Sequence, residues 1–535
     1  MRVFFTCHRC RRLTSVAPDA LGGEAACEHC GEKHLLPDDR NSYRTCPKAT
    51  CETLFFVSGP VEMCPECKSA LSVCPKPNCG TLNQYGGSYC RQCGHPTTAE
   101  TSWPQDGGNQ ERSGCLLPGT EFGCELTPSG TWDPCLGSEN GDENDTHLPA
   151  LVAAQGLLVY FNPHRGAFEA RDIRSGTDCF GHGVWQSAMH RTRALPYSSS
   201  PVVHGALLYT VTSQPTYVHR IALSTGKRQV CRLQLNGTMV PELPGVLPDY
   251  APPLLFRLPE RAASRAGLDS VLVILTTEGL CILEIDSLAR SPEPVLKGRF
   301  LPEADYRRHA WTRPAAVGPF IVATSHASPA ALCLDMTDYP NDVRSQVVQL
   351  KKLRASVGWN SPCIGLRNSG RNAERSACWY TTDDDNKESR LILFRPPTFY
   401  DVVEIAWVGV QNRYVEDNLG PVTDGKKVYL PYYSKTANTM GLISYDESGP
   451  AVQHIDIPTP GVSSFLAAVA DHTLVYPGRS RLYKVDPKHY APKPDSCGTL
   501  ASNGRETTCL SRPIVAGSRV FVQCSGLVSC FELRK

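Results

Sequence analysis

The chain has 535 residues, 41% of them hydrophobic, and carries 54 basic against 53 acidic side chains for a net charge of +1. This length exceeds one ordinary core, so we expect several domains or one large repeat architecture. The balanced charge excludes a large electrostatic field of either sign, so it does not suggest a polyanion or an anionic membrane as partner.

The beginning of the chain gives no sign of export. Its first eight residues lack the basic stretch and apolar segment of a signal peptide. No run of about 18 apolar residues occurs, so we expect no membrane span. We therefore expect a cytoplasmic protein, in which clustered thiols among the 25 cysteines indicate metal more often than disulfides.

Twelve cysteines lie in pairs within the first 93 residues. Each short pair can form a knuckle, and two knuckles joined by about 10–20 residues complete a tetrahedral zinc site. Only six residues separate the second set from the third, so pairing within sets is favoured. The sequence predicts three structural zinc ions, held by Cys7, Cys10, Cys27 and Cys30, by Cys46, Cys51, Cys64 and Cys67, and by Cys74, Cys79, Cys90 and Cys93.

Two other readings of these cysteines are weaker. Disulfides would require an oxidising compartment, and nothing in the sequence indicates secretion. An iron–sulfur cluster also uses four thiolates, but knuckles on hairpins favour zinc. Because each set already has four cysteines, we interpret the nearby histidines as surface groups or groups that contact the ligands: His8, His29, His34 and His95.

The third set resembles a double zinc ribbon family. Residues 74–80 read Cys-Pro-Lys-Pro-Asn-Cys-Gly, and residues 89–94 read Tyr-Cys-Arg-Gln-Cys-Gly. The set at 46–67 is a looser copy, and both have two extra residues in the first knuckle. Residues 4–37 resemble a separate bacterial zinc ribbon. These resemblances imply fold and metal. They leave function open, because such ribbons bind proteins, lipids or nucleic acids or brace a neighbouring domain.

The charge of this region bears on nucleic-acid binding. Residues 1–100 hold eleven basic and ten acidic side chains. Four thiolates on one Zn²⁺ carry a net charge of about −2, so three sites would make the region negative. Phosphate binding needs several uncompensated basic groups, and the sequence therefore disfavours nucleic acid as a partner.

Beyond a Gly-, Asn- and Asp-rich linker at about 97–147, the chain repeats itself. A short apolar run recurs at intervals of about 45–62 residues, and most runs follow a proline, a residue tolerated at the first position of a strand. The prolines are Pro149, Pro201, Pro252, Pro314, Pro362, Pro421 and Pro513, and residues 465–469 form a run without one. Residues 200–234 show four short strands separated by turns, which is typical of a β-propeller blade.

We count eight repeats, with seven as the alternative. The last repeat ends after its third strand at Lys535. We expect its missing outer strand to come from residues 115–147, which would close the ring and remove an open edge. The predicted fold is therefore mainly β, with three small zinc ribbons followed by an eight-bladed propeller.

The repeats resemble the pyrroloquinoline-quinone-like propeller repeat. Residues 207–209 (Leu-Leu-Tyr), 222–227 (Ala-Leu-Ser-Thr-Gly-Lys) and 424–429 (Asp-Gly-Lys-Lys-Val-Tyr) carry the likeness. Quinoprotein dehydrogenases of that family are exported and contain adjacent cysteines. This chain has neither an export signal nor a Cys-Cys pair, so the resemblance implies the fold without the cofactor.

No catalytic motif stands out. Phosphate-binding loops, H-E-x-x-H and G-x-S-x-G are all missing from the sequence. Asp383, Asp384 and Asp385 lack the spacing of a calcium loop, and we assign no chemistry to the group formed by His182, Trp185 and His190. The basic-aromatic stretch at 306–311 has a composition that suits a protein contact, but an isolated loop of this kind is more often neutral, and we favour that reading. Five later cysteines are interpreted as small core residues: Cys231, Cys281, Cys333, Cys524 and Cys530.

The sequence therefore favours a non-enzymatic, cytosolic adaptor or scaffold that docks partner proteins in a multi-protein assembly. Its expected domains are a zinc ribbon at 1–40, a double zinc ribbon at 41–96, the linker at 97–147 and the propeller at 148–535. Two alternatives remain. A basic face on a ribbon would favour a nucleic-acid-associated regulator, whereas polar groups converging at a channel mouth would favour an enzyme.

Overall fold

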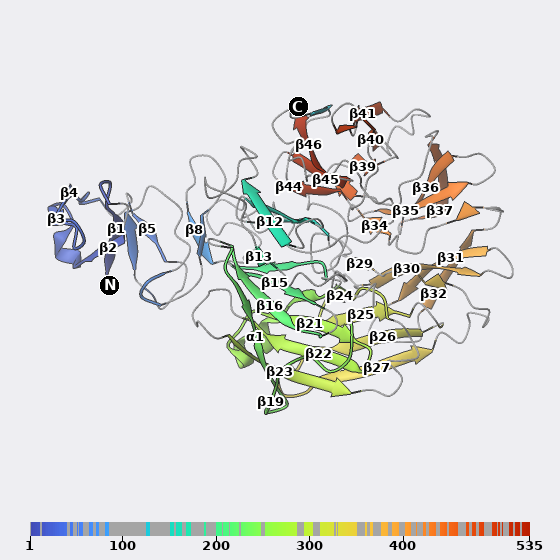
Figure 1. Ribbon diagram of the computed structural model, residues 1–535, viewed down its shortest axis with the longest axis horizontal. Coiled ribbons are helices and arrows are strands. Elements are labelled where there is room, and N and C mark those ends of the chain that lie inside the picture. The colour runs from blue at the N-terminus through green and yellow to red at the C-terminus, as the bar shows by residue number, and fades with distance from the viewer. Residues whose placement is uncertain are drawn as a thin grey trace. The chain divides into compact units, whose positions relative to one another are not determined.

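A computed structural model divides the chain into two units, Met1–Thr101 and Ser102–Lys535. Both are built from β-strands (Figure 1), and the described residues contain one α-helix. In the first unit the structure describes residues 2–10, 13–39, 43–46, 51, 53–56, 64–67, 71–73 and 81–84.

In the second unit the structure describes the residue ranges 125–128, 150–154, 157–162, 167–172, 187–188, 199–205, 207–212, 215–223, 226–247, 252–285, 294–302, 311–325, 328, 330–349, 359–360, 364–366, 376–383, 388–394, 402–407, 413–414, 421–423, 427–434, 439–446, 449–457, 467–469, 473–477, 481–485, 495–499, 501–502, 505–506, 513–516, 519–524 and 527–534.

The first unit is made of short hairpins. Its largest sheet has four strands in the order β2-β1-β6-β5. A short 3-10 helix follows the first hairpin, and two separate hairpins complete the described elements. The bounds are β1 (Val3–Thr6), β2 (Leu13–Val16), η1 (Pro18–Ala20), β3 (Glu24–Ala26), β4 (Lys33–Leu35), β5 (Arg44–Thr45), β6 (Leu54–Phe56), β7 (Leu71–Val73) and β8 (Leu82–Gln84).

One pairing in this sheet joins the first two cysteine sets. Strand β1 runs parallel to β6, with Val3 opposite Leu54 and Phe4 opposite Phe55. The rings of Phe4 and Phe55 stack with centroids 6.0 Å apart, and Phe55 is fully buried. The expected domain boundary between residues 40 and 41 therefore divides a continuous sheet, and the two ribbons share one small core.

The second unit contains eight sheets of four to six strands among its described residues. The first four sheets follow the repeats read from the sequence. Their strands are β10 (Val152–Ala154), β11 (Leu157–Asn162), β12 (Ala167–Asp172) and β13 (Ser187–Ala188); β14 (Val202–His204), β15 (Leu207–Val211), β16 (Val218–Ala222) and β17 (Arg228–Val230); β18 (Arg232–Leu235), β19 (Thr238–Val240), β20 (Leu254–Arg257), β21 (Ser270–Thr276), β22 (Gly279–Glu284) and β23 (Val295–Pro302), with α1 (Glu260–Ala266) between β20 and β21; and β24 (Ala315–Val317), β25 (Phe320–Thr324), β26 (Ala330–Asp335) and β27 (Arg344–Gln349).

The other four sheets lie further along the chain and are antiparallel throughout. Their strands are β28 (Trp359–Asn360), β29 (Ile364–Leu366), β30 (Ser376–Asp383), β31 (Glu388–Phe394) and β32 (Val402–Trp407); β33 (Arg413–Tyr414), β34 (Val422–Thr423), β35 (Lys427–Ser434), β36 (Thr439–Asp446) and β37 (Gly449–Ile457); β38 (Ala467–Val469), β39 (Thr473–Pro477), β40 (Arg481–Val485) and β41 (Asp495–Thr499); and β44 (Ile514–Ala516), β45 (Arg519–Cys524), β46 (Leu527–Arg534) and β9 (Glu125–Pro128), with a separate ladder of β42 (Ala501–Ser502) and β43 (Arg505–Glu506).

These sheets follow one another around a ring, as the colours of Figure 1 show from green β15 to red β44. Inner strands of successive sheets lie against each other, for example β10 against β14 and β38 against β44. The inner strand of the last sheet, β44, also lies against β10 of the first. This radial arrangement of sheets, each with at least four strands, is a β-propeller.

The ring closes through a strand from the beginning of the unit. Strand β9 pairs antiparallel with β46, and its residues Glu125 and Pro128 lie opposite Arg534 and Phe531. The missing outer strand of the last sheet thus falls within the 115–147 window read from the sequence. The side chain of Gln523 in β45 also donates a hydrogen bond of 2.9 Å to the backbone carbonyl of Phe161 in the first sheet.

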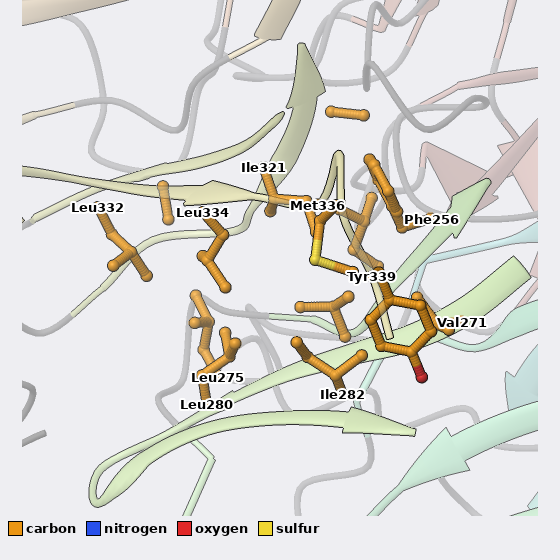
Figure 2. Packing of buried hydrophobic residues seen from close by; sticks show 14 of the residues in the cluster. Phe256, Val271, Leu275, Leu280, Ile282, Ile321, Leu332, Leu334, Met336 and Tyr339 are labelled. Carbon is orange, nitrogen blue, oxygen red and sulfur yellow. The ribbon is translucent and has the colours of Figure 1, made fainter. Parts of the chain in front are cut away.

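Apolar side chains fill the space between neighbouring sheets. Between the third and fourth sheets, Phe256, Val271 and Ile282 face Ile321 and Leu334 (Figure 2), and all five are fully buried. Burying such a side chain contributes about 1.5–3 kcal/mol, and similar clusters join the first sheet to the second and the second to the third. Sheet-to-sheet packing is therefore a major source of stability in the ring.

Candidate metal centre

The first cysteine set comes together as predicted. The sulfur atoms of Cys7 and Cys30 are 3.5 Å apart, and those of Cys10 and Cys27 are 3.6 Å apart. All four lie within 4.8 Å of one another. Zinc bonds of about 2.3 Å in a tetrahedron place sulfur atoms about 3.8 Å apart, so the four thiols fit one zinc ion.

The second set has the same geometry. Both Cys46–Cys67 and Cys51–Cys64 have sulfur–sulfur distances of 3.7 Å. Three of the four side chains are buried and contribute to a core with Phe55. The sequence therefore predicted both of these ligand groups, and the structure brings each together at zinc-binding distances.

The two knuckles of the first tetrad each lie at a turn between two paired strands. In the first ribbon, Thr6 pairs with Leu13 on either side of the Cys7–Cys10 turn, and Ala26 pairs with Lys33 beside the second turn. The Cys27 amide also donates a 2.8 Å hydrogen bond to the Glu32 carbonyl. The strand pairs hold the turns fixed, so the thiols of each turn point toward a common centre.

A buried threonine hydroxyl contacts one sulfur in each tetrad. Thr14 lies 3.2 Å from the sulfur of Cys27, and Thr53 lies 3.1 Å from that of Cys51. Donation from Thr14 is the main cause that lowers the pKa of Cys27 to about 6. Hydrogen bonds to a thiolate favour its charged form, which is the form that binds zinc. The sequence interpretation had missed these two residues.

Of the histidines near the first tetrad, one contacts a cysteine ligand and the others contact neighbouring groups. His34 contacts a ligand directly, with its Nε2 atom 3.3 Å from the sulfur of Cys7. The rings of His34 and His8 meet edge to face, and His8 also approaches the carboxylate of Glu32. His29 lies 3.3 Å from the carbonyl of Leu13 instead, and His95 lies outside the described residues.

The ligands of the third set also lie outside the described residues: Cys74, Cys79, Cys90 and Cys93. The strands on either side of its first cysteine pair are described, and Val73 pairs with Leu82. In the second set, Thr45 pairs with Leu54 on either side of Cys46 and Cys51. Both pairs stand one residue before the first cysteine and three after the second, so the two hairpins follow the same plan.

Two chemical consequences follow from the described tetrads. All four ligands in each are cysteines, so a bound zinc ion has no open position for water or substrate. Structural zinc of this kind stabilises small folds that have almost no apolar core, by on the order of 10–16 kcal/mol. The centre can therefore hold the ribbons rigid, and it is not built for hydrolysis.

Among the described residues, the others singled out from the sequence do not form a second metal centre. Trp311, at the end of the basic-aromatic stretch, is 1% exposed and packs in the core of the third and fourth sheets, so it cannot serve as a surface contact. Burial raises the pKa of the Cys231 and Cys281 thiols to about 12. Those two and the buried Cys333 and Cys530 are core residues, as predicted.

The remaining candidates cannot be placed. Asp383 ends β30, while the following aspartates lie outside the described residues, as do His182, Trp185, His190 and residues 306–310. Within the described part of the chain, no helix is long and apolar enough to cross a membrane.

Comparison with known proteins gives no family assignment. No family model matches the chain, and no curated protein matches it. Among solved structures, a europium-containing methanol dehydrogenase is 10% identical, covering 80% of this chain and 90% of its own, with a TM-score of 0.49. The Dos1 propeller is 9% identical, covering 73% and 94%, with a TM-score of 0.41. A virginiamycin B lyase from Staphylococcus aureus is 9% identical, covering 74% and 98%, with a TM-score of 0.36.

Proposed function

We propose that this protein is a zinc-stapled docking scaffold that assembles partner proteins in the cytoplasm and has no catalytic activity of its own. The observation that carries the proposal is the pair of closed cysteine tetrads joined through the β1–β6 pairing. Two closed metal sites joined through one sheet fix the shape of the surface around them. Such a rigid surface suits recognition of another protein more than turnover of a substrate.

The proposal includes a third zinc ion. The Val73–Leu82 pair repeats the plan of the Thr45–Leu54 pair around a turn with the same cysteine spacing. A hairpin of that plan in the second set supplies two ligands of a complete tetrad. We assign the third ion to Cys74, Cys79, Cys90 and Cys93, and we count the eight sheets as eight blades of one ring.

The charge of the ribbons supports a protein as partner rather than nucleic acid. Exposed basic side chains of the first ribbon face acidic ones: Arg9 lies 3.2 Å from Glu32, and Lys33 lies 2.9 Å from Glu24. Such pairs leave little basic charge for phosphates, and each thiolate tetrad adds a net negative charge when zinc is bound.

The test is purification of the tagged, full-length chain from its own cells, followed by mass spectrometry of the intact complex. The proposal expects a species heavier than the 58.5 kDa chain, containing at least one other protein in fixed ratio and no nucleic acid. A chain that purifies as a bare monomer would contradict it, and so would one that purifies with nucleic acid as its only partner.

A further inference from the structure

The third sheet has two outer strands that the other seven sheets lack in their described parts. After β17 the chain forms the β18–β19 hairpin, and β18 pairs in parallel with the outermost strand of the regular blade, β23. The six-stranded sheet therefore ends in β19, which lies at the lower rim of the ring in Figure 1.

The hairpin is held rigidly against the blade. Asn236 and Gly237 form its two-residue turn, with backbone φ angles of 50° and 85°, as a type I′ turn requires. The side-chain amide of Asn236 donates a 2.9 Å hydrogen bond to the Phe300 carbonyl and accepts one of 3.3 Å from the Phe300 amide. These two bonds fix the turn of the hairpin to β23.

The outer edge of β19 can accept another strand. A two-residue turn makes Leu235 and Thr238 a hydrogen-bonded pair, so the alternation of an antiparallel ladder makes Gln234 and Met239 a non-bonded pair. The backbone N–H and C=O of Met239 therefore point away from β18. No strand of the described chain pairs with β19 on that side, and such an edge is a template for pairing with another chain.

We call β18, β19 and the adjoining strand β23 the extension of the third sheet. One face of this extension is apolar and basic. Met239 and Val295 are 51% and 47% exposed, although large hydrophobic side chains in the rest of the described propeller are mostly buried. The register places them on the same face as Arg232 and Lys297, and Arg299 is two residues further along β23. The opposite face carries Leu233, Leu235 and Leu296, which are buried against the second sheet.

The extension carries a local positive charge, although the whole chain is nearly neutral. Residues 232–240 and 294–302 contain three basic side chains and no acidic one. The Glu284 carboxylate and Arg299 both lie near the Tyr339 hydroxyl, so Glu284 offsets one of these positive charges. The face keeps a positive balance, which complements an acidic ligand.

We propose that the edge strand β19 and the face of Met239, Val295, Arg232, Lys297 and Arg299 bind an extended, acidic segment of a partner protein, which adds a seventh strand to the third sheet. This is recognition by strand addition, in which backbone hydrogen bonds give affinity and alternate side chains give specificity. The inference rests on the proposed docking function and names where one partner binds and what chemistry it has.

The test places a photo-activated cross-linker, p-benzoylphenylalanine, at Met239 of the full-length chain in an extract of its own cells. Val230 is the matched control position, because it is 46% exposed but lies on β17, outside the extension. We expect a cross-linked peptide richer in Asp and Glu than in Lys and Arg at Met239 and not at Val230. The double variant Arg232→Glu, Lys297→Glu should reduce its yield about tenfold or more.

Arg261→Glu provides the control for charge reversal, because Arg261 is an exposed arginine on α1; its yield should not change. A synthetic peptide of the captured sequence should also slow hydrogen exchange at the Met239 amide. Capture of a neutral or basic segment, of a second copy of this chain, of nucleic acid or of nothing would overturn the inference. If partners co-purify with the chain but none is captured at Met239, the docking function stands and this site for it is wrong.

Discussion

Gln523 and Phe161 are 362 positions apart in the sequence, yet the Gln523 side chain donates a buried hydrogen bond of 2.9 Å to the Phe161 carbonyl. The bond joins the last sheet of the ring to the first. Because Gln523 is fully buried, its amide group has no access to water as an alternative partner.

Gln523→Leu should therefore destabilise the ring. Loss of the amide leaves the Phe161 carbonyl without this donor in a buried site, which costs about 1–3 kcal/mol. Urea unfolding of the full-length chain measures the effect. Gln346→Leu is the control, since Gln346 is exposed on β27, and we expect it to change stability by less than about 0.5 kcal/mol. Equal effects of the two substitutions would show that ring closure does not depend on this contact.

Ring closure also depends on β9. A chain that begins at Ser102 keeps residues 125–128, whereas one that begins at Ser129 lacks them and exposes the edge of β46. We expect the first to unfold cooperatively, with its urea midpoint near that of the full chain. The second should lose on the order of 3 kcal/mol or aggregate, because four ladder positions lose their partners. Indistinguishable unfolding curves would contradict the assignment of β9 as the closing strand.

Phe55 is fully buried in a core with three cysteines of the second tetrad, and its ring stacks on Phe4 in the strand that leads to Cys7. Phe55→Ala should destabilise the shared sheet by about 3–5 kcal/mol and speed the release of zinc from both tetrads, measured with a colorimetric chelator. Phe56→Ala is the matched control, because Phe56 is 36% exposed. If Phe55→Ala speeds release from one tetrad only, the two ribbons do not act as one body.

Ionisation of the buried Tyr339 phenol should lower the stability of the folded protein in alkaline solution. Burial, and after it the nearby Glu284 carboxylate, raises the pKa of this phenol to about 12. The folded state therefore favours the neutral phenol, and its stabilising effect is complete below about pH 10 and is lost as the pH rises toward 12. We expect a decline on the order of 2 kcal/mol over that range. Tyr339→Phe should show a shallower decline, and an unchanged one would exclude Tyr339 as its cause.

The local part of the metal centre could be predicted from sequence, because knuckle spacing is set by neighbouring residues. Cys7 to Cys30 and Cys46 to Cys67 come together as their spacing indicates. The parallel pairing of Val3 with Leu54 could not be read in the same way, since short apolar strands carry no mark of a distant partner. The hydroxyls of Thr14 and Thr53 likewise depend on how the hairpins pack.

In the propeller, too, local features could be predicted from the sequence, whereas features that depend on packing could not. Alternating strands and turn residues predicted the repeats, and the incomplete last repeat indicated a strand from 115–147. Trp311 was grouped with a basic-aromatic loop, and its basic neighbours concealed its place in the core. The Asn236–Gly237 turn was an available signal for the extra hairpin, but the regular four-strand count left no room for two more strands.

The amino-terminal unit is held together by zinc in the account given above. Native mass spectrometry of the full-length chain purified without chelator, with elemental analysis of the same sample, tests this dependence on zinc most directly. We predict three zinc ions per chain, all lost on acidification together with the folded signal of residues 1–96 but not that of the propeller. One zinc ion or none, or iron in its place, would contradict the account.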